Sequence, residues 1–325
     1  MDNEHLPFSE VLDRLFSAGR VPISLVYRLS DMSREELSAF QRRWSEQPPD
    51  RRRIIARHMA DISEENFVVD FSPVFLRLMS DDSAEVRLAA VEGLWDTSNL
   101  AVVGPMIDLM QNDQEPEVRA SAASCLGHFV LMAEWGQIEQ SVGDRIVRAL
   151  SDQYEQVDAA EEVRRASLES LGSAADPRVA GYIREAYDRG GETMQLSAVY
   201  AMGQTADRRW VPIIIQEMRS PYMEMRLEAA RSAGNIGSGD AVDRLIELLH
   251  DEELEVQLAA VTALGQIGSD QAYEALAVLM DDEDAYELHE AIEEAMDEIE
   301  WLGGDLDLTL MEWDDDEFVD DDEFD

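Results

Sequence analysis

The residues of this sequence that could carry out chemistry are scattered along the chain. The histidines do not form an H-E-x-x-H pattern, which would place two metal ligands on one helix face; they are His5, His58, His128, His250 and His289. No serine–histidine–aspartate set and no cysteine–histidine pair stands out as a nucleophilic site. All 26 basic residues are arginine, so no lysine could form a Schiff base. We therefore expect no catalytic residue, no metal and no cofactor.

Two short segments superficially resemble ligand-binding loops. The run G-N-I-G-S-G at 234–239 lacks the preceding strand and the Lys-Ser/Thr ending of a phosphate loop. It occupies the same repeat position as G-Q-I-G-S-D at 265–270, so we interpret it as the end of a helix. The aspartates near the C-terminus lack the glycine and the spacing of a calcium loop, which leaves at most weak, nonspecific divalent binding.

A pair of complementary residues, separated by six positions, recurs along the chain. An aspartate precedes an arginine, or a glutamine in its place, at Asp81 and Arg87, Asp113 and Arg119, Asp158 and Arg164, and Asp251 and Gln257. An aspartate at a turn between helices can cap the second helix, and the arginine can bridge to turn carbonyls or to the next aspartate. We interpret these pairs as a structural ladder rather than as a phosphate- or carboxylate-binding row.

An apolar pattern recurs with these pairs and must position them. Its clearest copy is E-V-Q-L-A-A-V-T-A-L-G-Q-I-G over 255–268. The apolar residue before the arginine or glutamine gives successive spacings of 32, 45, 31, 31, 31 and 32 residues; the markers are Val86, Val118, Val163, Met194, Met225, Val256 and Leu288. A fixed period in this range predicts stacked helix pairs. Small residues three or four positions after each marker would let helices approach closely.

These features together resemble the HEAT and HEAT-like (phycobilisome-lyase-type) repeats. The resemblance covers residues 50–302 and rests on the D-x5-R pair, the A-x3-L-G run and the apolar first helix. It implies an all-α, right-handed α-solenoid of stacked helix pairs. Such repeats serve scaffolds, lyases and a few enzymes, so the resemblance says little about function. Iron-binding hydroxylases of this class need several His-Glu pairs at matching positions, and only His289-Glu290 has that form.

The chain divides into three predicted segments. Residues 1–49 form a helical N-terminal cap with an S-x-x-E capping box at Ser33 and Glu36. Residues 50–302 form the solenoid, with about seven helix pairs, an N-cap at Asp50 and a terminal capping helix over 286–302. The 45-residue interval adds roughly 14 residues, which we divide between a helix through Trp135 and a loop over 152–160. Residues 303–325 form an acidic disordered tail.

The charge of the chain is strongly negative and unevenly distributed. The net charge of −45 divides into −15 over residues 1–244 and −30 over residues 245–325, where no basic residue occurs. This field disfavours direct nucleic-acid binding and attracts a basic partner. No apolar run is long enough to span a membrane, and the acidic N-terminus does not resemble a signal peptide. A single cysteine, Cys125, is interpreted as buried filler. We expect a cytoplasmic protein.

The sequence favours a non-catalytic scaffold that binds a basic protein or peptide; its oligomeric state stays open. Outward positions on the second helices and aromatic residues of the tail are the predicted binding residues: Glu92, Glu162, Glu169, Tyr200, Glu224, Arg231, Glu255, Trp313, Phe318 and Phe324. Alternatively, the tail screens a basic nucleic-acid-binding client, folds back on the arginines of 42–57, or only improves solubility. A lyase or hydroxylase-like activity rests on the repeat resemblance alone.

Overall fold

The computed structural model describes residues 6–17, 19–65 and 68–303 of the chain, and all regular structure in them is helical. The predicted tail residues Trp313, Phe318 and Phe324 lie outside the described residues. Two compact units are present, residues 1–236 (unit 1) and 237–325 (unit 2). The division falls inside the predicted 50–302 solenoid, and the predicted boundaries at its two ends remain predictions.

The described part of unit 1 contains α1 to α14 and three short 3₁₀ helices. The α-helices are α1 Phe8–Phe16, α2 Ile23–Val26, α3 Arg34–Trp44, α4 Pro49–Glu65, α5 Ser72–Leu78, α6 Ala84–Glu92, α7 Val103–Asn112, α8 Pro116–Glu134, α9 Gln140–Glu155, α10 Glu161–Leu171, α11 Val179–Arg189, α12 Glu192–Gln204, α13 Val211–Glu217 and α14 Met223–Ile236. The 3₁₀ helices are η2 Tyr27–Leu29, η3 Leu100–Val102 and η4 Arg208–Trp210. The all-α fold class is confirmed.

Helices α1 and α3 pack through an aromatic cluster. The ring centroids of Phe16 and Phe40 lie 6.0 Å apart, and those of Phe40 and Trp44 lie 5.1 Å apart. The predicted capping box is confirmed, because the Ser33 hydroxyl accepts from the Glu36 N–H and the Glu36 carboxylate accepts from the Ser33 N–H. The predicted N-cap at Asp50 is wrong: α4 already begins at Pro49, whose fixed φ suits a first helical turn.

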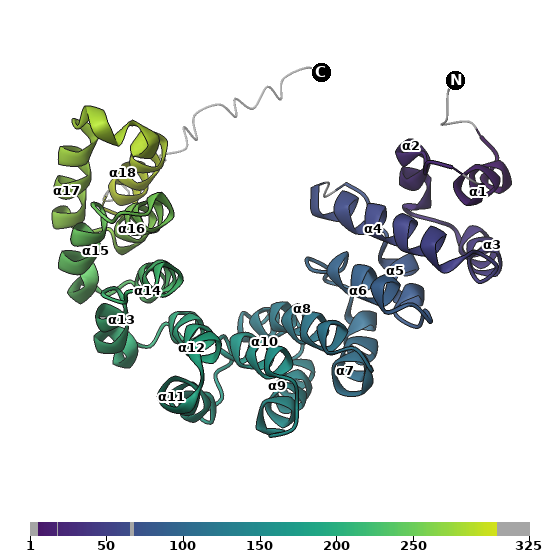
Figure 1. Cartoon of the computed structure of the whole chain (residues 1–325), viewed down its shortest axis with the longest axis horizontal. Coiled ribbons are helices and arrows are strands. Elements are labelled where there is room, and N and C mark those ends of the chain that lie inside the picture. The colour runs from purple at the N-terminus through teal and green to yellow at the C-terminus, as the bar shows by residue number, and fades with distance from the viewer. Residues whose placement is uncertain (1–5, 18, 66–67, 304–325) are drawn as a thin grey trace, which may run out of the picture. The chain divides into compact units, whose positions relative to one another are not determined.

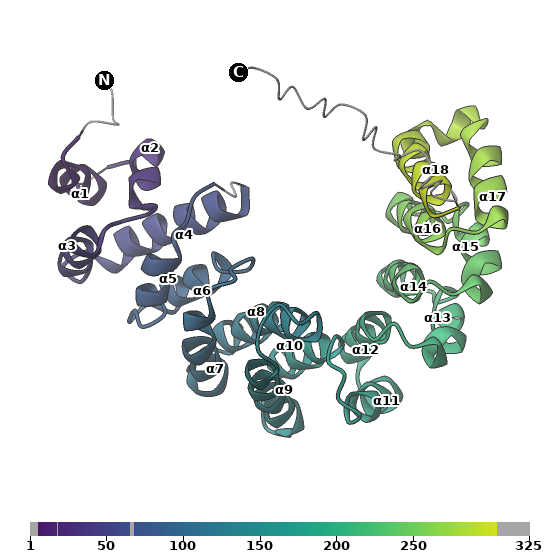
Figure 2. The same ribbon diagram turned by 180° about the vertical axis from the view of Figure 1, so that it is seen from behind.

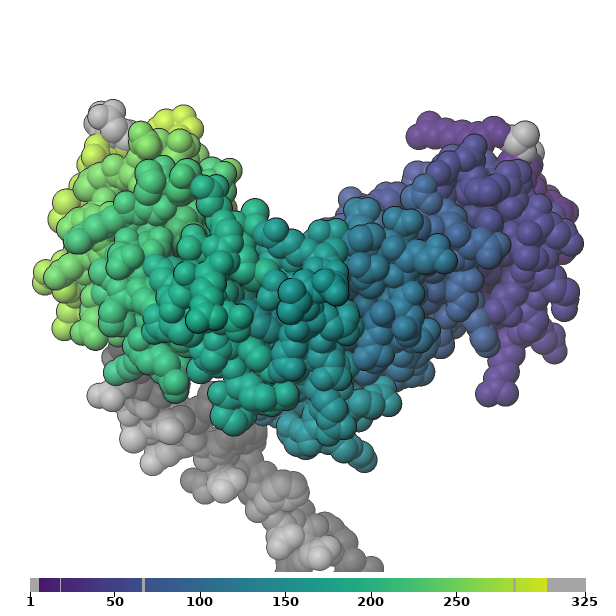
Figure 3. Space-filling model, turned by 60° about the horizontal axis from the view of Figure 1, so that its bottom comes forward, coloured from purple at the N-terminus to yellow at the C-terminus, as the bar shows by residue number. Residues whose placement is uncertain are grey.

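The helices of unit 1 form two rows. The second helix of each pair belongs to an inner row in which α4, α6, α8, α10, α12 and α14 pack against one another in sequence, whereas α7, α9, α11 and α13 lie on the other side (Figures 1 and 2). The predicted markers are buried in this row: Val86, Val118, Val163, Met194 and Met225. In the space-filling view the packed helices make a continuous ridged surface from the purple to the teal residues (Figure 3).

Small side chains set how closely the inner helices approach. A Cβ on Gly203 of α12 would lie 2.8 Å from the Cα of Ser232 on α14, and one on Gly172 of α10 would lie 3.1 Å from the Cα of Ala201 on α12. The buried Ser232 hydroxyl donates to the Val199 carbonyl oxygen at 2.9 Å. Only residues without bulk at these positions permit backbone-to-side-chain contact between successive helices.

The seventh position after the marker provides a repeated bond between inner helices. Seven residues after their markers, Cys125 of α8, Ser170 of α10 and Ser232 of α14 each point a polar hydrogen at the inner helix before them. The Cys125 Sγ–H donates to the Val91 carbonyl oxygen at 3.3 Å, and the Ser170 hydroxyl donates to that of Ala123 at 2.9 Å. Cys125 is therefore buried, as predicted, and it also joins two helices.

The irregular 45-residue interval lengthens two helices. α8 has 19 residues and ends at Glu134, and α9 has 16 residues and ends at Glu155. The predicted loop over 152–160 is therefore too long, since only residues 156–160 are non-helical. Ser151, Gln153 and Tyr154 are buried against neighbouring helices, and this burial extends α9 into the sequence that resembles a polar loop.

Unit 2 repeats the same helix pairing over its described residues. Its helices are η5 Gly239–Ala241, α15 Val242–Leu248, α16 Leu254–Ile267, α17 Asp270–Met280, η6 Glu283–Leu288 and α18 His289–Gly303. A Cβ on Gly265 of α16 would lie 3.0 Å from the Cα of Ala295 on α18. The last α-helix begins at His289 rather than at residue 286, because residues 286–288 belong to the 3₁₀ helix η6. The run 234–239 is the end of α14 and the start of η5, so its interpretation as a helix end is confirmed.

Among the described residues, no helix has both the length and the apolarity required to cross a membrane.

Replacing Gly203 by alanine should lower the free energy of unfolding by about 1–3 kcal/mol, because the new methyl group overlaps Ser232 and forces the two helices apart. Urea denaturation followed by circular dichroism measures the change. Gly181→Ala is the matched control, since no atom lies within 4 Å of a Cβ on this helical glycine. The control should be neutral or stabilising, by up to about 1 kcal/mol. Equal destabilisation by both variants would contradict the packing argument.

Candidate protein-binding surface

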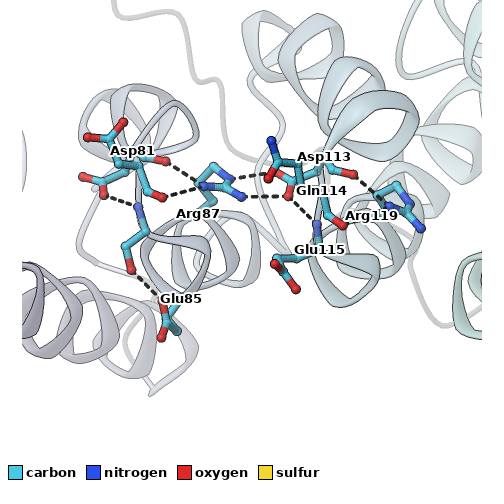
Figure 4. Close-up of polar contacts among 9 residues, drawn as sticks. Asp81, Glu85, Arg87, Asp113, Gln114, Glu115 and Arg119 are labelled. Carbon is cyan, nitrogen blue, oxygen red and sulfur yellow. Dashed lines mark hydrogen bonds and ion pairs between the residues drawn. The ribbon is translucent and has the colours of Figure 1, made fainter.

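The aspartate–arginine ladder connects successive turns of unit 1 (Figure 4). Arg87 donates through Nε and Nη2 to the two carboxylate oxygens of Asp113, both at 2.7 Å, and through Nη1 to the Asp81 carbonyl oxygen at 2.8 Å. Asp113 in turn accepts from the N–H of Glu115 at 3.0 Å. Burial opposes the ionisation of Asp113, but the Arg87 guanidinium outweighs it and lowers the pKa of this carboxyl.

The aspartates lie two positions before the N-caps of the second helices, so the predicted capping role is wrong. Asp81, Asp113 and Asp251 each accept from the N–H two residues ahead, at Ser83, Glu115 and Glu253. Those three residues are themselves the N-caps of α6, α8 and α16. The aspartates therefore order the turn that leads into the second helix, rather than binding the orphan N–H groups of its first turn.

The ladder changes along the chain where the sequence spacing changes. Arg119 donates to the Asp113 carbonyl oxygen at 2.8 Å but does not reach Asp158, which the longer interval displaces. Arg164 instead donates to the Tyr154 carbonyl oxygen at 3.0 Å and lies over the Tyr154 ring. In unit 2, Gln257 donates to the Asp251 carbonyl oxygen at 2.6 Å. The bond from the arginine or glutamine side chain to a carbonyl oxygen thus persists in repeats that lack the bond to the next aspartate carboxylate.

Sequence reasoning missed the first member of the ladder. Arg52 of α4 donates to the Asp81 carboxylate at 2.6 Å, and the Trp44 indole N–H donates to the same oxygen at 2.7 Å. Both side chains are buried with Asp81. Arg52 escapes the repeat pattern because Arg51, rather than an apolar marker, precedes it. The 35-residue spacing from Arg52 to Arg87 is the signal that could have revealed it.

The arginines of 42–57 do not form an open cationic patch. Five of these six side chains already hold partners in unit 1. Arg53 pairs with Glu85 at 2.8 Å and Arg57 pairs with Glu92 at 2.5 Å. The predicted binding residue Glu92 is consequently half-buried and neutralised by α4. Only Arg42 of the cluster is exposed without a pair among the described residues.

A different situation holds at the N-terminal ends of α10, α12 and α14 and at the C-terminal end of α13. We define the acidic edge as Glu161, Glu162, Glu192, Glu217 and Glu224. Neutral groups donate to three of these carboxylates: the Thr193 hydroxyl to Glu161, the Tyr222 hydroxyl to Glu192, and the Tyr187 hydroxyl to Glu217. Among the described residues, no side chain pairs with the exposed predicted residues Glu162 and Glu224. No ion pair among the described residues therefore neutralises their charge.

The acidic edge contains a pocket of about 400 Å³ between α12, α13 and α14. Its wall carries Glu192, Glu217 and Glu224, its apolar lining includes Leu196 and Met225, and Tyr222 stands beside them with 56% of its surface exposed. The pocket is completed by Thr193, Gln195 and Ser220. Arg226 donates to the Ser220 carbonyl oxygen at 3.1 Å, so one positive charge lies beside three negative ones. Such a pocket suits a cationic side chain with an aliphatic stem.

The predicted residues Glu169, Tyr200 and Arg231 occupy the sixth position after the marker on α10, α12 and α14. The structure brings them into one charge-balanced cluster. Arg165 lies 3.7 Å from Glu169 and donates to the Ser197 hydroxyl at 2.8 Å. Tyr200 is 38% exposed, and burial together with Glu169 and Glu228 raises the pKa of its hydroxyl. Because the cluster already contains two arginines, it attracts a cation less than the acidic edge does.

Glu228 is the residue of this cluster that sequence reasoning missed. Burial, with a smaller contribution from Glu169, raises the pKa of its carboxyl to about 7, against the opposing effects of Arg231 and the Ser232 hydroxyl. The sequence does contain a signal that sets Glu228 apart. Three residues after the marker, every other copy carries alanine or serine: Ala89, Ser121, Ala166, Ser197, Ala259 and Ala291.

In unit 2, the predicted binding residue Glu255 lies exposed in the first turn of α16. Large apolar side chains are also exposed on unit 2, among them Leu254, Val278, Tyr286 and Trp301. The tail predictions Trp313, Phe318 and Phe324 lie outside the described residues, so these positions stay predictions.

Across residues 6–17, 19–65 and 68–303, no group of three or more histidine, cysteine or acidic side chains could hold a metal ion. Burial raises the pKa of the Cys125 thiol to about 12, which keeps it protonated.

Comparisons with known proteins identify the repeat class. Residues 71–142 and 211–297 match HEAT repeats. Among solved structures, the complex of Kap95p with RanGDP contains a chain with a TM-score of 0.54 and 14% identity over 92% of this chain and 47% of that one. This likeness, below 25% identity, shows the shared fold. The chain is therefore a HEAT-like repeat protein, and it spans about half the length of that structure.

Two further similar structures are enzymes or enzyme subunits. The complex of CpcE and CpcF of phycocyanin lyase from Nostoc sp. PCC7120 has a TM-score of 0.47 and 17% identity over 70% of this chain and 94% of that one. Human deoxyhypusine hydroxylase has a TM-score of 0.35 and 18% identity over 90% of this chain and 96% of that one. None of the curated proteins compared by sequence matches the chain.

Replacing Arg87 by lysine should lower the free energy of unfolding by about 1–3 kcal/mol, because an ammonium group cannot make the paired bonds to Asp113 and the bond to the Asp81 carbonyl together. Urea denaturation measures this change in the free energy of unfolding. Arg209→Lys is the control: its pair with Asp207 is solvent-exposed, so the cost should be below about 1 kcal/mol. Equal losses of unfolding free energy in the two variants would contradict the conclusion that the ladder stabilises the fold.

Glu228→Gln should make stability less dependent on pH. The folded-state pKa of Glu228 is raised, so the folded protein retains a proton that the unfolded chain releases, and stability falls as pH rises from about 4.5 to above 7. The variant should therefore gain up to about 3 kcal/mol relative to the natural chain at pH 8 and little at pH 4. Denaturant titrations across this pH range measure the difference.

Glu224→Gln, on the same helix, controls for the loss of one negative charge. A parallel gain in both variants would show that the general charge of the chain, rather than the buried Glu228 carboxyl, determines the pH dependence.

Proposed function

We propose that this chain is a non-catalytic scaffold that binds a basic segment of a partner protein along the acidic edge. The observation that carries the proposal is the pocket at Glu192, Glu217 and Glu224. The side chains that donate hydrogen bonds to Glu192 and Glu217 are neutral phenol and amide groups. On α6, by contrast, arginines of α4 neutralise Glu85 and Glu92. Directly before a marker, Glu85 is therefore paired with an arginine, whereas no side chain among the described residues pairs with Glu162 or Glu224.

The physical basis of such recognition is electrostatic attraction combined with shallow apolar contact. A net charge of −15 over residues 1–244 speeds the approach of a cationic segment. Leu196 and Met225 line the pocket and can contact the methylene stem of an arginine or lysine. A scaffold role requires no convergence of nucleophile, base and oxyanion donor. We assign the protein to the cytoplasm, a reducing compartment that suits a single buried thiol.

The acidic tail is the second candidate for the binding element. Residues 303–325 contain 12 acidic residues and no arginine, which is the composition of a segment that screens a basic client. Binding of the tail to the arginines of 42–57 in the same chain is disfavoured, because five of those six arginines hold partners in unit 1. Capture of a separate basic protein by the tail remains the alternative.

A binding titration separates these candidates. A fluorescein-labelled, arginine-rich peptide is titrated with the full chain, and fluorescence anisotropy reports the dissociation constant at several salt concentrations. The variant Glu192→Gln with Glu224→Gln should weaken binding by about tenfold, because it removes two unpaired charges from the pocket. Affinity of the unaltered chain should fall as salt increases.

The matched control is Glu85→Gln with Glu92→Gln, which removes the same charge from carboxylates already paired with arginines. This control should change affinity by no more than about twofold. An equal loss in both variants would reduce the proposal to nonspecific attraction. Deletion of residues 304–325 that abolishes binding, while the acidic-edge variant retains it, would assign recognition to the tail.

A further inference from the structure

We propose that Glu228 and Tyr200 form a second subsite for the basic segment, at which a cationic side chain binds and displaces the carboxyl proton of Glu228. The displaced proton passes to the solvent, and the positive charge of the ligand takes its place beside the carboxylate. This inference rests on the proposed function, because it adds a subsite and a pH dependence to the surface that binds the same partner.

Glu228 lies one helical turn from the pocket. It follows Glu224 by four residues on α14, and the Cβ atoms of residues at this spacing lie about 5–6 Å apart on one face of a helix. Glu224 lines the pocket, and Glu228 is half-buried rather than enclosed. A basic segment anchored in the pocket can therefore continue along α14 and bring a second cationic side chain to Glu228.

An aromatic side chain lies beside this carboxyl group. Tyr200 belongs to α12, which packs against α14, and is 38% exposed. Burial raises the pKa of the Tyr200 hydroxyl, and the charges of Glu169 and Glu228 add to this effect. An exposed aromatic ring and a carboxylate both attract positive charge, so together they favour a guanidinium or ammonium group.

The charged groups that face Glu228 do not neutralise it. Glu169 of α10 is itself paired with Arg165 at 3.7 Å. Arg231 of α14 lowers the pKa of Glu228, but the two side chains form no ion pair within the described residues. Glu217, the only titratable residue of α13, lines the pocket at the N-terminal end of α14. An ionised Glu228 is thus available to a cation from the partner.

The hydroxyl group that reaches Glu228 has a second acceptor. The Ser232 hydroxyl lies 3.4 Å from the Glu228 carboxylate and 2.9 Å from the Val199 carbonyl oxygen. A hydroxyl carries one hydrogen, and the shorter bond is the stronger one. Burial therefore dominates and raises the pKa of Glu228 to about 7. A cationic side chain supplies both hydrogen-bond donors and the opposite charge, so its binding favours the ionised carboxylate.

The sequence supports a specific role for Glu228. Every other copy of the repeat carries alanine or serine three residues after the marker, so stacking of the helices does not require a glutamate there. Burying its charge lowers stability at neutral pH. A residue that opposes stability and that packing does not require is typical of a functional site.

Proton release during binding tests the inference. The probe is an arginine-rich peptide with blocked termini and no histidine, which has no group that titrates between about pH 5 and 9. Isothermal titration calorimetry of the full chain in two buffers of different ionisation enthalpy measures the protons released. Binding at pH 6 should release about one proton and binding at pH 8 almost none, because Glu228 is already ionised at pH 8. Affinity should rise about tenfold from pH 6 to pH 8.

Two variants assign the proton. Glu228→Gln should abolish both the release at pH 6 and the rise in affinity, because glutamine does not ionise. Glu85→Gln with Glu92→Gln should preserve both, since it removes charge from carboxylates already paired with arginines of α4. Circular dichroism verifies that each variant retains its helices.

The outcomes separate this inference from the function on which it rests. Binding of the peptide at pH 6 without proton release would overturn the subsite and leave the acidic edge as the binding site. Proton release that persists in Glu228→Gln would also overturn the subsite, because another group would then supply the proton. Failure of the peptide to bind at either pH would overturn both the subsite and the proposed function.

Discussion

Close contact between successive inner helices is the constraint on which the rest of the structure depends. No helix pair covers its own apolar stripe, so each second helix must pack against the next one. Gly203 against Ser232 and Gly172 against Ala201 permit this approach because neither glycine carries a side chain. Hydrogen bonds from Cys125, Ser170 and Ser232 to carbonyl oxygens of the preceding inner helix then fix the register of the contact.

Electrostatic pairing follows from the same stacking and divides the inner row into two regions. Because α4 lies beside α6, its arginines reach Glu85 and Glu92 and neutralise them, while Arg52 binds the buried Asp81. Beyond the long helices α8 and α9, Glu161 and Glu192 accept hydrogen bonds from the hydroxyls of Thr193 and Tyr222 instead. Glutamates on different inner helices therefore have different electrostatic environments, with arginine partners on α6 and neutral donors on α10 and α12.

The acidic edge and the Tyr200 cluster differ in their exposure to water. Most carboxylates of the acidic edge are exposed, so water weakens their electrostatic interactions, whereas burial shields Glu228 in the Tyr200 cluster. The most perturbed carboxyl, Glu228, faces Tyr200, Arg231 and Glu169 rather than a histidine or a thiol. An extended ligand can make several weak contacts across repeats, and the sum of those contacts provides affinity and register.

The sequence by itself determined the periodic features. The markers, the small residues beside them and the capping box at Ser33 depend on local spacing, so the helices and their buried faces could be predicted from them. Tertiary structure decided which charges are paired, since Arg53 lies 32 residues from Glu85 and Arg52 lies 29 residues from Asp81. It also extended α9 through Tyr154 by burial and placed Glu228 beside Tyr200. Such contacts depend on neighbouring repeats, whose side chains meet only after the helices have stacked.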